Sequence, residues 1–167
     1  MPTIKEINAF TEQQFTDTFG AIFENSAWIA QKAALARPFA TVSEVFTHMQ
    51  TIVENADTEQ KVALILEHPE LGTRLQMSDH SVAEQKNAGL NALTEIEFHL
   101  LSQLNEQYRK KFRFPFIIAV IDLTKHDIIE AIQARIHNSL EEEFNTALQQ
   151  IHKIGRTRFE ALTAIQI

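Results

Sequence analysis

Apolar residues recur at steps of three and four along most of this chain, which is the spacing of one face of an α-helix. Several of these stretches follow a hydroxyl residue with glutamate or glutamine three positions later, the signature of a capping box. The candidate boxes are Thr3–Glu6, Thr11–Gln14, Thr41–Glu44, Ser81–Glu84 and Ser139–Glu142. The pattern predicts helices near residues 4–9, 12–19, 26–35, 42–54, 58–67, 82–88, 91–111, 125–137 and 140–165.

One apolar run does not fit a helix. Residues Phe114–Ile121 are almost continuously apolar and contain Pro115, so periodicity leaves a strand and a buried extended segment equally open. Because no second good strand is present to pair with this run, a sheet is not expected. We therefore predict an all-α fold, a helical bundle of about nine helices with one buried extended connector. The length and the even composition predict a single domain over residues 1–167.

Composition narrows the class of protein. No cysteine is present, which removes disulfides, thiolate nucleophiles and cysteine metal ligands. The net charge is −7, and the one dense basic cluster, Arg109–Lys111 with Arg113, is too short to predict nucleic-acid binding. No apolar run reaches the roughly 18 residues of a membrane span. No leader peptide or Ser-Lys-Leu ending is recognisable either. We expect a soluble cytoplasmic protein with neither nucleic acid nor membrane as a partner.

The densest group of reactive side chains surrounds one predicted helix break. His68 precedes Pro69, and a residue before proline avoids the helical region, so the imidazole is held at a helix end. No metal-binding spacing such as H-E-x-x-H occurs, so no metal site is expected. Five other histidines are expected to be exposed or satisfied within the protein: His48, His99, His126, His137 and His152.

The stretch Ser81–Gln85, which opens the next predicted helix, allows two interpretations. In the first, Ser81 and Glu84 form a capping box and Gln85 is solvated. In the second, the helix N-terminus binds an electron-rich ligand that faces Ser81, Glu84 and Gln85 together. Spacing alone leaves both open.

Arg158 interrupts the apolar stripe predicted for the last helix, four residues from Ile154 and from Leu162. A buried guanidinium needs a partner. A protein carboxylate is the commoner partner, and a ligand anion is the alternative because arginine suits bidentate carboxylate recognition. The stripe itself is predicted to consist of Phe144, Leu148, Ile151, Ile154, Leu162 and Ile165.

The apolar connector has its own candidate for binding. Phe112, Phe114 and Phe116 are most simply core residues. Because Pro115 prevents a helix, however, the backbone groups of residues 116–120 lack helical partners and must bond elsewhere. A ligand rich in amide groups is one such partner.

Taken in order, these motifs resemble one family over essentially the whole chain, the 2-oxo-4-hydroxy-4-carboxy-5-ureidoimidazoline (OHCU) decarboxylases of urate breakdown. Ala27 stands where the family usually has proline, and Arg113 where it usually has glycine. The motifs that carry the resemblance are Phe23-Glu24, Ser26, Trp28, Arg37-Pro38-Phe39, His68-Pro69-Glu70-Leu71-Gly72, Ser81, Glu84-Gln85, Ala88-Gly89-Leu90, Asn105, Tyr108, Phe112, Phe114-Pro115-Phe116-Ile117, Ile154 and Arg158.

The resemblance implies a homodimeric decarboxylase that needs no cofactor and acts on a small ureidoimidazoline. It implies that His68 is the proton donor and that Arg158 supplies a cationic contact. On this basis we predict that Glu84, together with His68, orients the substrate. The remaining residues implied to line the substrate are Pro69, Ser81, Val82, Ala83, Gln85, Phe116, Ile117, Ile118, Ala119 and Val120. Two alternatives stay open: a ureide hydrolase with Glu84 as general base, and a non-catalytic helical adaptor of the same fold.

Overall fold

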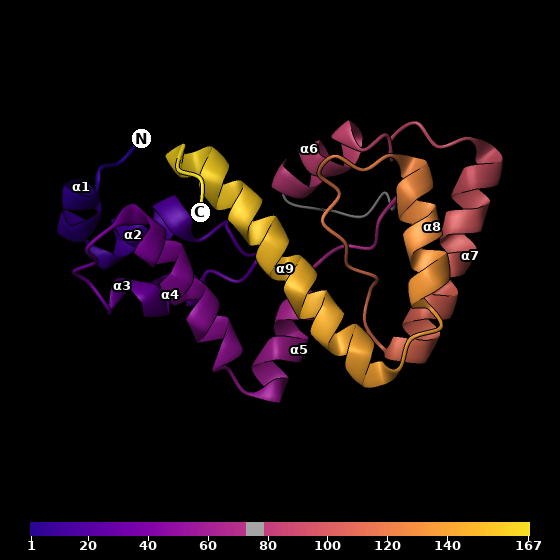
Figure 1. The fold of residues 1–167 in the computed structure, drawn as a ribbon, viewed down its shortest axis with the longest axis horizontal. Coiled ribbons are helices and arrows are strands. Elements are labelled where there is room, and N and C mark those ends of the chain that lie inside the picture. Colours follow the sequence, from indigo (N-terminus) through magenta and orange to yellow (C-terminus); the bar gives the residue numbers. More distant parts are fainter. Residues whose placement is uncertain (73–78) are drawn as a thin grey trace. The chain divides into compact units, whose positions relative to one another are not determined.

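The computed structural model describes residues 1–72 and 79–167, and in these residues it contains nine helices and no strand (Figure 1). This confirms the predicted all-α fold. None of the helices described is both long and apolar enough to cross a bilayer. The helices are α1 (Ile4–Ala9), α2 (Glu12–Phe19), α3 (Trp28–Ala34), α4 (Val42–Glu54), α5 (Thr58–Leu66), α6 (Asp79–Asn87), α7 (Glu95–Phe112), α8 (Lys125–Arg135) and α9 (Leu140–Thr163).

Capping explains why most predicted helix starts are confirmed. The boxes at Thr3 and Thr11 have both hydrogen bonds, as does the box in which Ser139 and Glu142 exchange bonds of 2.7 and 3.2 Å. At α4 the Thr41 hydroxyl caps the helix, but the Glu44 carboxylate accepts from the preceding Ala40 N–H instead. The capping hydroxyls satisfy backbone donors that the first helical turn leaves without a partner.

The described chain forms two compact units. The first unit comprises Met1–Glu67 and His152–Ile167, and the second comprises His68–Ile151. In the first unit, phenylalanine rings of α2 and α9 pack together, with centroids of Phe19 and Phe159 5.8 Å apart. In the second, the Tyr108 ring lies 4.4 Å from that of Phe112 and 5.3 Å from that of Phe116. Each unit thus has its own aromatic core, and the single domain over residues 1–167 stays a prediction.

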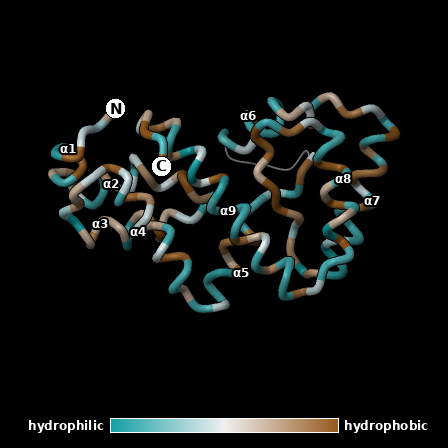
Figure 2. The backbone as a smooth tube through the Cα atoms, in the orientation of Figure 1, coloured by the Kyte–Doolittle hydropathy of each residue, from teal (hydrophilic) through white to brown (hydrophobic). Residues whose placement is uncertain are grey.

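The predicted connector is confirmed. Residues 115–120 have no regular secondary structure, and all but the half-buried Ile118 are buried. The connector is one of the hydrophobic segments of Figure 2, between α7 and α8. It begins after Arg113, the C-cap of α7, whose φ of 65° and ψ of 18° are left-handed. Glycine adopts this conformation without strain. Here Arg113 adopts it, at the position where the resembled family usually has glycine.

Several predicted elements differ from the structure. Helix α3 begins at Trp28 rather than at residue 26, and α7 begins at Glu95 rather than at residue 91. Helix α6 begins at Asp79, before the predicted start at residue 82. In α9 the predicted apolar stripe is partly wrong, because Leu162 is 37% exposed whereas Phe159 is fully buried. Over a helix this long, a stripe extrapolated at fixed steps drifts around the axis, which places Phe159 rather than Leu162 on the buried face.

Candidate functional site

His68 is buried, with 7% of its surface exposed, and it lies directly after Glu67, the C-cap of α5. The prediction that the helix stops before Pro69 is therefore confirmed. A residue fixed at a helix end and enclosed by protein has few accessible orientations, which is what a general acid requires. Pro69 beside it is half-buried.

The residues that follow His68 bond to two helices. The amide Nδ2 of Asn105 in α7 donates to the Leu71 carbonyl at 3.0 Å, and the Gly72 N–H donates to Oε1 of Gln85 in α6, also at 3.0 Å. The carboxylate of Glu70 forms an ion pair with Arg109 of α7. The interpretation of Gln85 as a solvated residue is wrong, because Gln85 is buried and ties α6 to this segment.

The early start of α6 changes the interpretation of Ser81. Ser81 lies inside the helix, at its third residue, so the predicted capping box of Ser81 with Glu84 is wrong. Ser81 is buried and Glu84 is half-buried, whereas Val82 is 49% exposed and Ala83 is also exposed. The helical period explains this division, since residues 81, 84 and 85 share one face and residues 82 and 83 lie on another.

A buried ionic network holds the connector. The Glu143 carboxylate of α9 is fully buried and accepts from Tyr108, from Asn138 at 2.9 Å and from Arg135 of α8 at 2.8 Å. Burial by itself would raise the pKa of Glu143, but the hydrogen bonds from Arg135, Tyr108 and Asn138 outweigh it and hold that pKa below its ordinary value. Burial, reinforced by the Glu143 carboxylate, raises the pKa of Tyr108. Glu143 is therefore an anion that accepts three converging donors.

The network reaches the backbone of the connector directly. Arg135 donates to the Ile117 carbonyl at 2.7 Å, and its guanidinium lies 4.3 Å from the centroid of the Phe116 ring. The Ala119 N–H donates to Oε1 of Gln150 in α9 at 2.9 Å, and the Val120 carbonyl accepts from Leu123 at 3.1 Å. Side chains and a turn thus bond three groups of the predicted ligand-binding backbone. A ligand there would bond other groups of the connector.

Replacing Glu143 by glutamine is expected to lower the free energy of unfolding at pH 7 by about 2 kcal/mol, since hydrogen bonds to a charged group are worth roughly 1.5–3 kcal/mol. Because the folded-state pKa of Glu143 is lowered, its contribution is present above the unfolded-state pKa and disappears as the pH falls through the folded-state pKa. The difference in unfolding free energy between wild type and Glu143→Gln should therefore shrink below pH ~4.5. Urea unfolding at neutral and acidic pH measures this, and a constant difference would contradict it.

Arg158 has the protein partner that was the commoner expectation. Its Nη2 lies 3.0 Å from Oε2 of Glu24, and the exposed fractions of the two side chains are 3% and 0%. The other Nη atom lies 3.5 Å from the carbonyl oxygens of Ala21 and Ile22. Arg158 belongs to the first unit, whereas His68, Glu84 and the connector belong to the second. Its predicted contact with a ligand stays a prediction.

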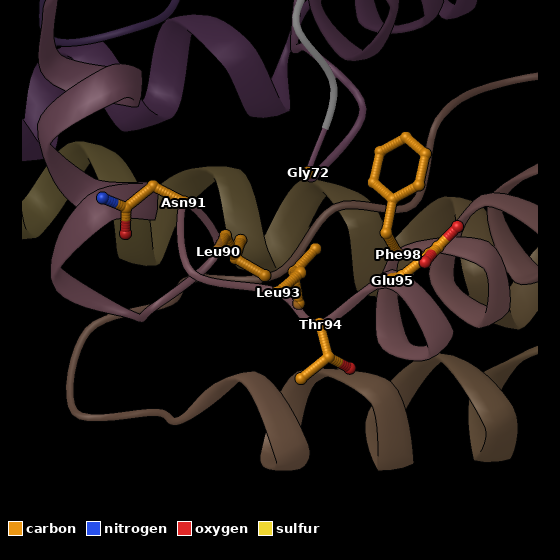
Figure 3. A pocket seen from close by; sticks show the side chains of 7 residues that line it. All are labelled: Gly72, Leu90, Asn91, Leu93, Thr94, Glu95 and Phe98. Carbon is orange, nitrogen blue, oxygen red and sulfur yellow. The ribbon is translucent and has the colours of Figure 1, made fainter.

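Two pockets lie along the Glu70–Gly72 segment. The larger, of about 560 Å³, is drawn in Figure 3 and lies between Gly72, the loop before α7 and the first turn of α7. The smaller, of about 370 Å³, lies over the contacts of Glu70, Leu71 and Gly72 with α7. Neither is lined by His68, Ser81 or Glu84. Within the described parts of the chain, no cluster of three or more His, Asp or Glu side chains could hold a metal ion.

Comparison with known proteins identifies the family. The sequence model described as OHCU decarboxylase matches residues 8–160. An OHCU decarboxylase of Haloferax volcanii is 39% identical over 156 residues, which cover 93% of this chain and 93% of that protein. The uric acid degradation bifunctional protein PucL of Bacillus subtilis is 46% identical over 158 residues, 95% of this chain. This chain spans only 32% of that longer protein.

Solved structures have the same fold. A crystal structure of (S)-allantoin synthase superposes with a TM-score of 0.80 at 29% identity, covering 97% of this chain and 54% of that one. An OHCU decarboxylase crystallised in the presence of (S)-allantoin has a TM-score of 0.72 at 23% identity, covering 86% of this chain and 96% of that one. The family match spans nearly the whole sequence, and a relative of similar length agrees with it. The chain therefore belongs to the OHCU decarboxylase family.

Proposed function

We propose that this protein decarboxylates OHCU to (S)-allantoin in urate degradation, with His68 as the proton donor. The observation that carries the proposal is the buried imidazole of His68 at the end of α5, at the place where the family motif has its histidine. Membership of the OHCU decarboxylase family supplies the substrate. The protein acts without a cofactor and as a homodimer, two points that rest on the family resemblance, and it acts in the cytoplasm, as the sequence predicts.

The substrate supplies its own electron sink in this mechanism. The bond between the ring carbon and the carboxylate breaks, carbon dioxide leaves, and the electron pair moves into the neighbouring ring imine, whose nitrogen takes up a proton. The enol formed then gains a proton on carbon and loses its hydroxyl proton, so that one proton is gained overall. Alignment of the breaking bond with the imine π-system supplies much of the reduction in the activation barrier.

Each proposed residue has a distinct task. Glu84 accepts a hydrogen bond from the substrate hydroxyl and orients the carboxylate for departure. His68 delivers the proton to one face of the carbon, which gives a single enantiomer; a positioned acid contributes roughly 10²–10⁴-fold. Pro69 and the buried face of α6, which carries Ser81 and Gln85, line the substrate.

The connector and Arg158 complete the proposed site. Backbone groups of residues 116–120 bind the ring and ureido amides, apart from three that the protein already bonds. These are the Ile117 carbonyl, the Ala119 N–H and the Val120 carbonyl. Arg158 offsets negative charge of the substrate. Val82 and Ala83 take part through their backbone only, because their side chains lie on the exposed face of α6.

The test uses OHCU generated in situ from urate, which decays unaided to racemic allantoin. The protein is expected to speed that decay, release carbon dioxide and produce the circular-dichroism signal of one enantiomer. Release of ammonia instead of carbon dioxide would indicate the ureide hydrolase. An unchanged decay with no optical signal would leave only the non-catalytic adaptor.

A further inference from the structure

We propose that α7 is the helix that positions His68, through a stripe formed by Leu101, Asn105 and Arg109. These residues are four apart and therefore lie on one face of the helix. The proposal rests on the decarboxylase function proposed above and assigns positioning roles, since none of the three needs to touch the substrate.

The stripe contacts three consecutive residues that follow His68. Arg109 pairs with the Glu70 carboxylate, and Asn105 donates to the Leu71 carbonyl at 3.0 Å. Leu101 packs against Gly72 so closely that a Cβ atom on Gly72 would lie 2.8 Å from Leu101 Cδ2. The segment therefore runs antiparallel to α7, with one side chain of the stripe for each of its residues.

One peptide group is held from both sides. The Leu71 carbonyl accepts from Asn105 of α7, and the N–H of the same peptide, on Gly72, donates to Gln85 of α6. Gly72 has a φ of +72°, a conformation that L side chains rarely adopt. A peptide bonded at both its polar groups, three residues after His68, leaves the intervening backbone little freedom. The backbone next to the imidazole of His68 is thus held in place.

Asn105 is not the residue that stability alone would favour at this position. Its Oδ1 is buried and has no hydrogen-bond partner among residues 1–72 and 79–167. A buried acceptor without a donor is destabilising, so an apolar residue of the same shape would serve a purely structural position at least as well. Its Nδ2, by contrast, donates to the Leu71 carbonyl, in the segment that follows His68.

The same helix also holds the other proposed wall of the site. Tyr108, three residues after Asn105, donates to Glu143, which pairs with Arg135. Arg135 in turn donates to the Ile117 carbonyl of the connector. Because α7 anchors both segments, the distance between the proton donor and the backbone that binds the substrate depends on one rigid element, as precise catalytic geometry requires.

The test compares Asn105→Leu and Arg109→Met with wild type in the OHCU assay. We expect kcat to fall about ten- to hundredfold in each, with KM changed less than about twofold, because the variants disturb a group that acts only in the transition state. The melting temperature of Asn105→Leu should shift by no more than about 4 °C. The variant removes Oδ1, an acceptor without a partner among the described residues, and leaves the Leu71 carbonyl without its donor. Arg109→Lys should recover part of kcat, because lysine keeps the charge that faces Glu70.

Lys110→Met is the matched control. Lys110 neighbours Arg109 on α7, but its side chain is 73% exposed and pairs along the helix with Glu106, at 2.7 Å. It should keep the wild-type kcat. A second readout does not depend on activity: in ¹⁵N-histidine spectra, the His68 resonances, assigned with His68→Asn, should shift in Asn105→Leu and Arg109→Met and stay in place in Lys110→Met.

The possible failures are distinguishable. An inactive wild type would overturn the proposed decarboxylation. An active wild type with undiminished kcat in Asn105→Leu and Arg109→Met, or with unmoved His68 resonances, would overturn the positioning role alone. A fall in kcat that cooling restores along with the folded fraction would make the stripe merely structural.

Discussion

The substitution His68→Asn is expected to abolish decarboxylation. Asparagine keeps a polar side chain of similar reach but cannot deliver a proton, so the loss should be on the order of the 10²–10⁴-fold that general acid catalysis provides. Because the buried His68 side chain is replaced by a smaller polar one, helical circular dichroism should stay unchanged. Turnover is measured with OHCU formed in situ, together with the optical signal of the allantoin produced.

The matched control is His99→Asn. His99 lies on α7 with 69% of its side chain exposed, and its Nε2 lies 4.0 Å from Oε1 of the still more exposed Glu95. It should retain both the rate and the optical signal of wild type. If His68→Asn still forms one enantiomer at the wild-type rate, His68 is not the essential acid, and the proton must come from another group.

Helix boundaries were predictable because they depend on local capping chemistry. Thr11 and Ser139 each exchange hydrogen bonds with a residue three positions on, which the sequence displays directly. Ser81 shows the limit of that logic, because the same pattern occurs inside α6 rather than at its start. A capping motif marks a helix start only where the preceding residues do not themselves continue the helix. Before Ser81, Asp79 and His80 already belong to α6.

The sequence predicted that Arg158 and the connector are buried, but not which residues bond them. The sequence indicates that Arg158 is buried, because it fills a gap in an apolar stripe, yet nothing local identifies Glu24 as its partner. Likewise, the connector was expected to need partners, but Arg135 and Gln150 could not be named, since long-range pairing depends on how the helices pack. The α7 stripe was not predicted, because only its contacts with the segment after His68 set these three residues apart.

Replacing Arg158 by methionine is expected to cost about 3–5 kcal/mol of unfolding free energy, since it removes the cation that faces a buried carboxylate. Glu24 has no exposed side-chain surface, so water cannot replace the guanidinium. The double variant Arg158→Met/Glu24→Leu should recover most of this loss, because an apolar pair of similar volume often matches a buried ion pair. Urea unfolding of the wild type, Arg158→Met, Glu24→Leu and the double variant forms a double-mutant cycle.

The same cycle separates the two roles proposed for Arg158. If Arg158 only balances Glu24, the double variant regains both stability and the wild-type KM. If it also contacts the anionic substrate, the double variant is as stable as wild type but has a raised KM. We expect the second result, with a KM at least about tenfold higher, the equivalent of ~1.4 kcal/mol for one lost ionic contact. Restored stability with an unchanged KM would assign Arg158 to the core of the first unit and remove it from the proposed site.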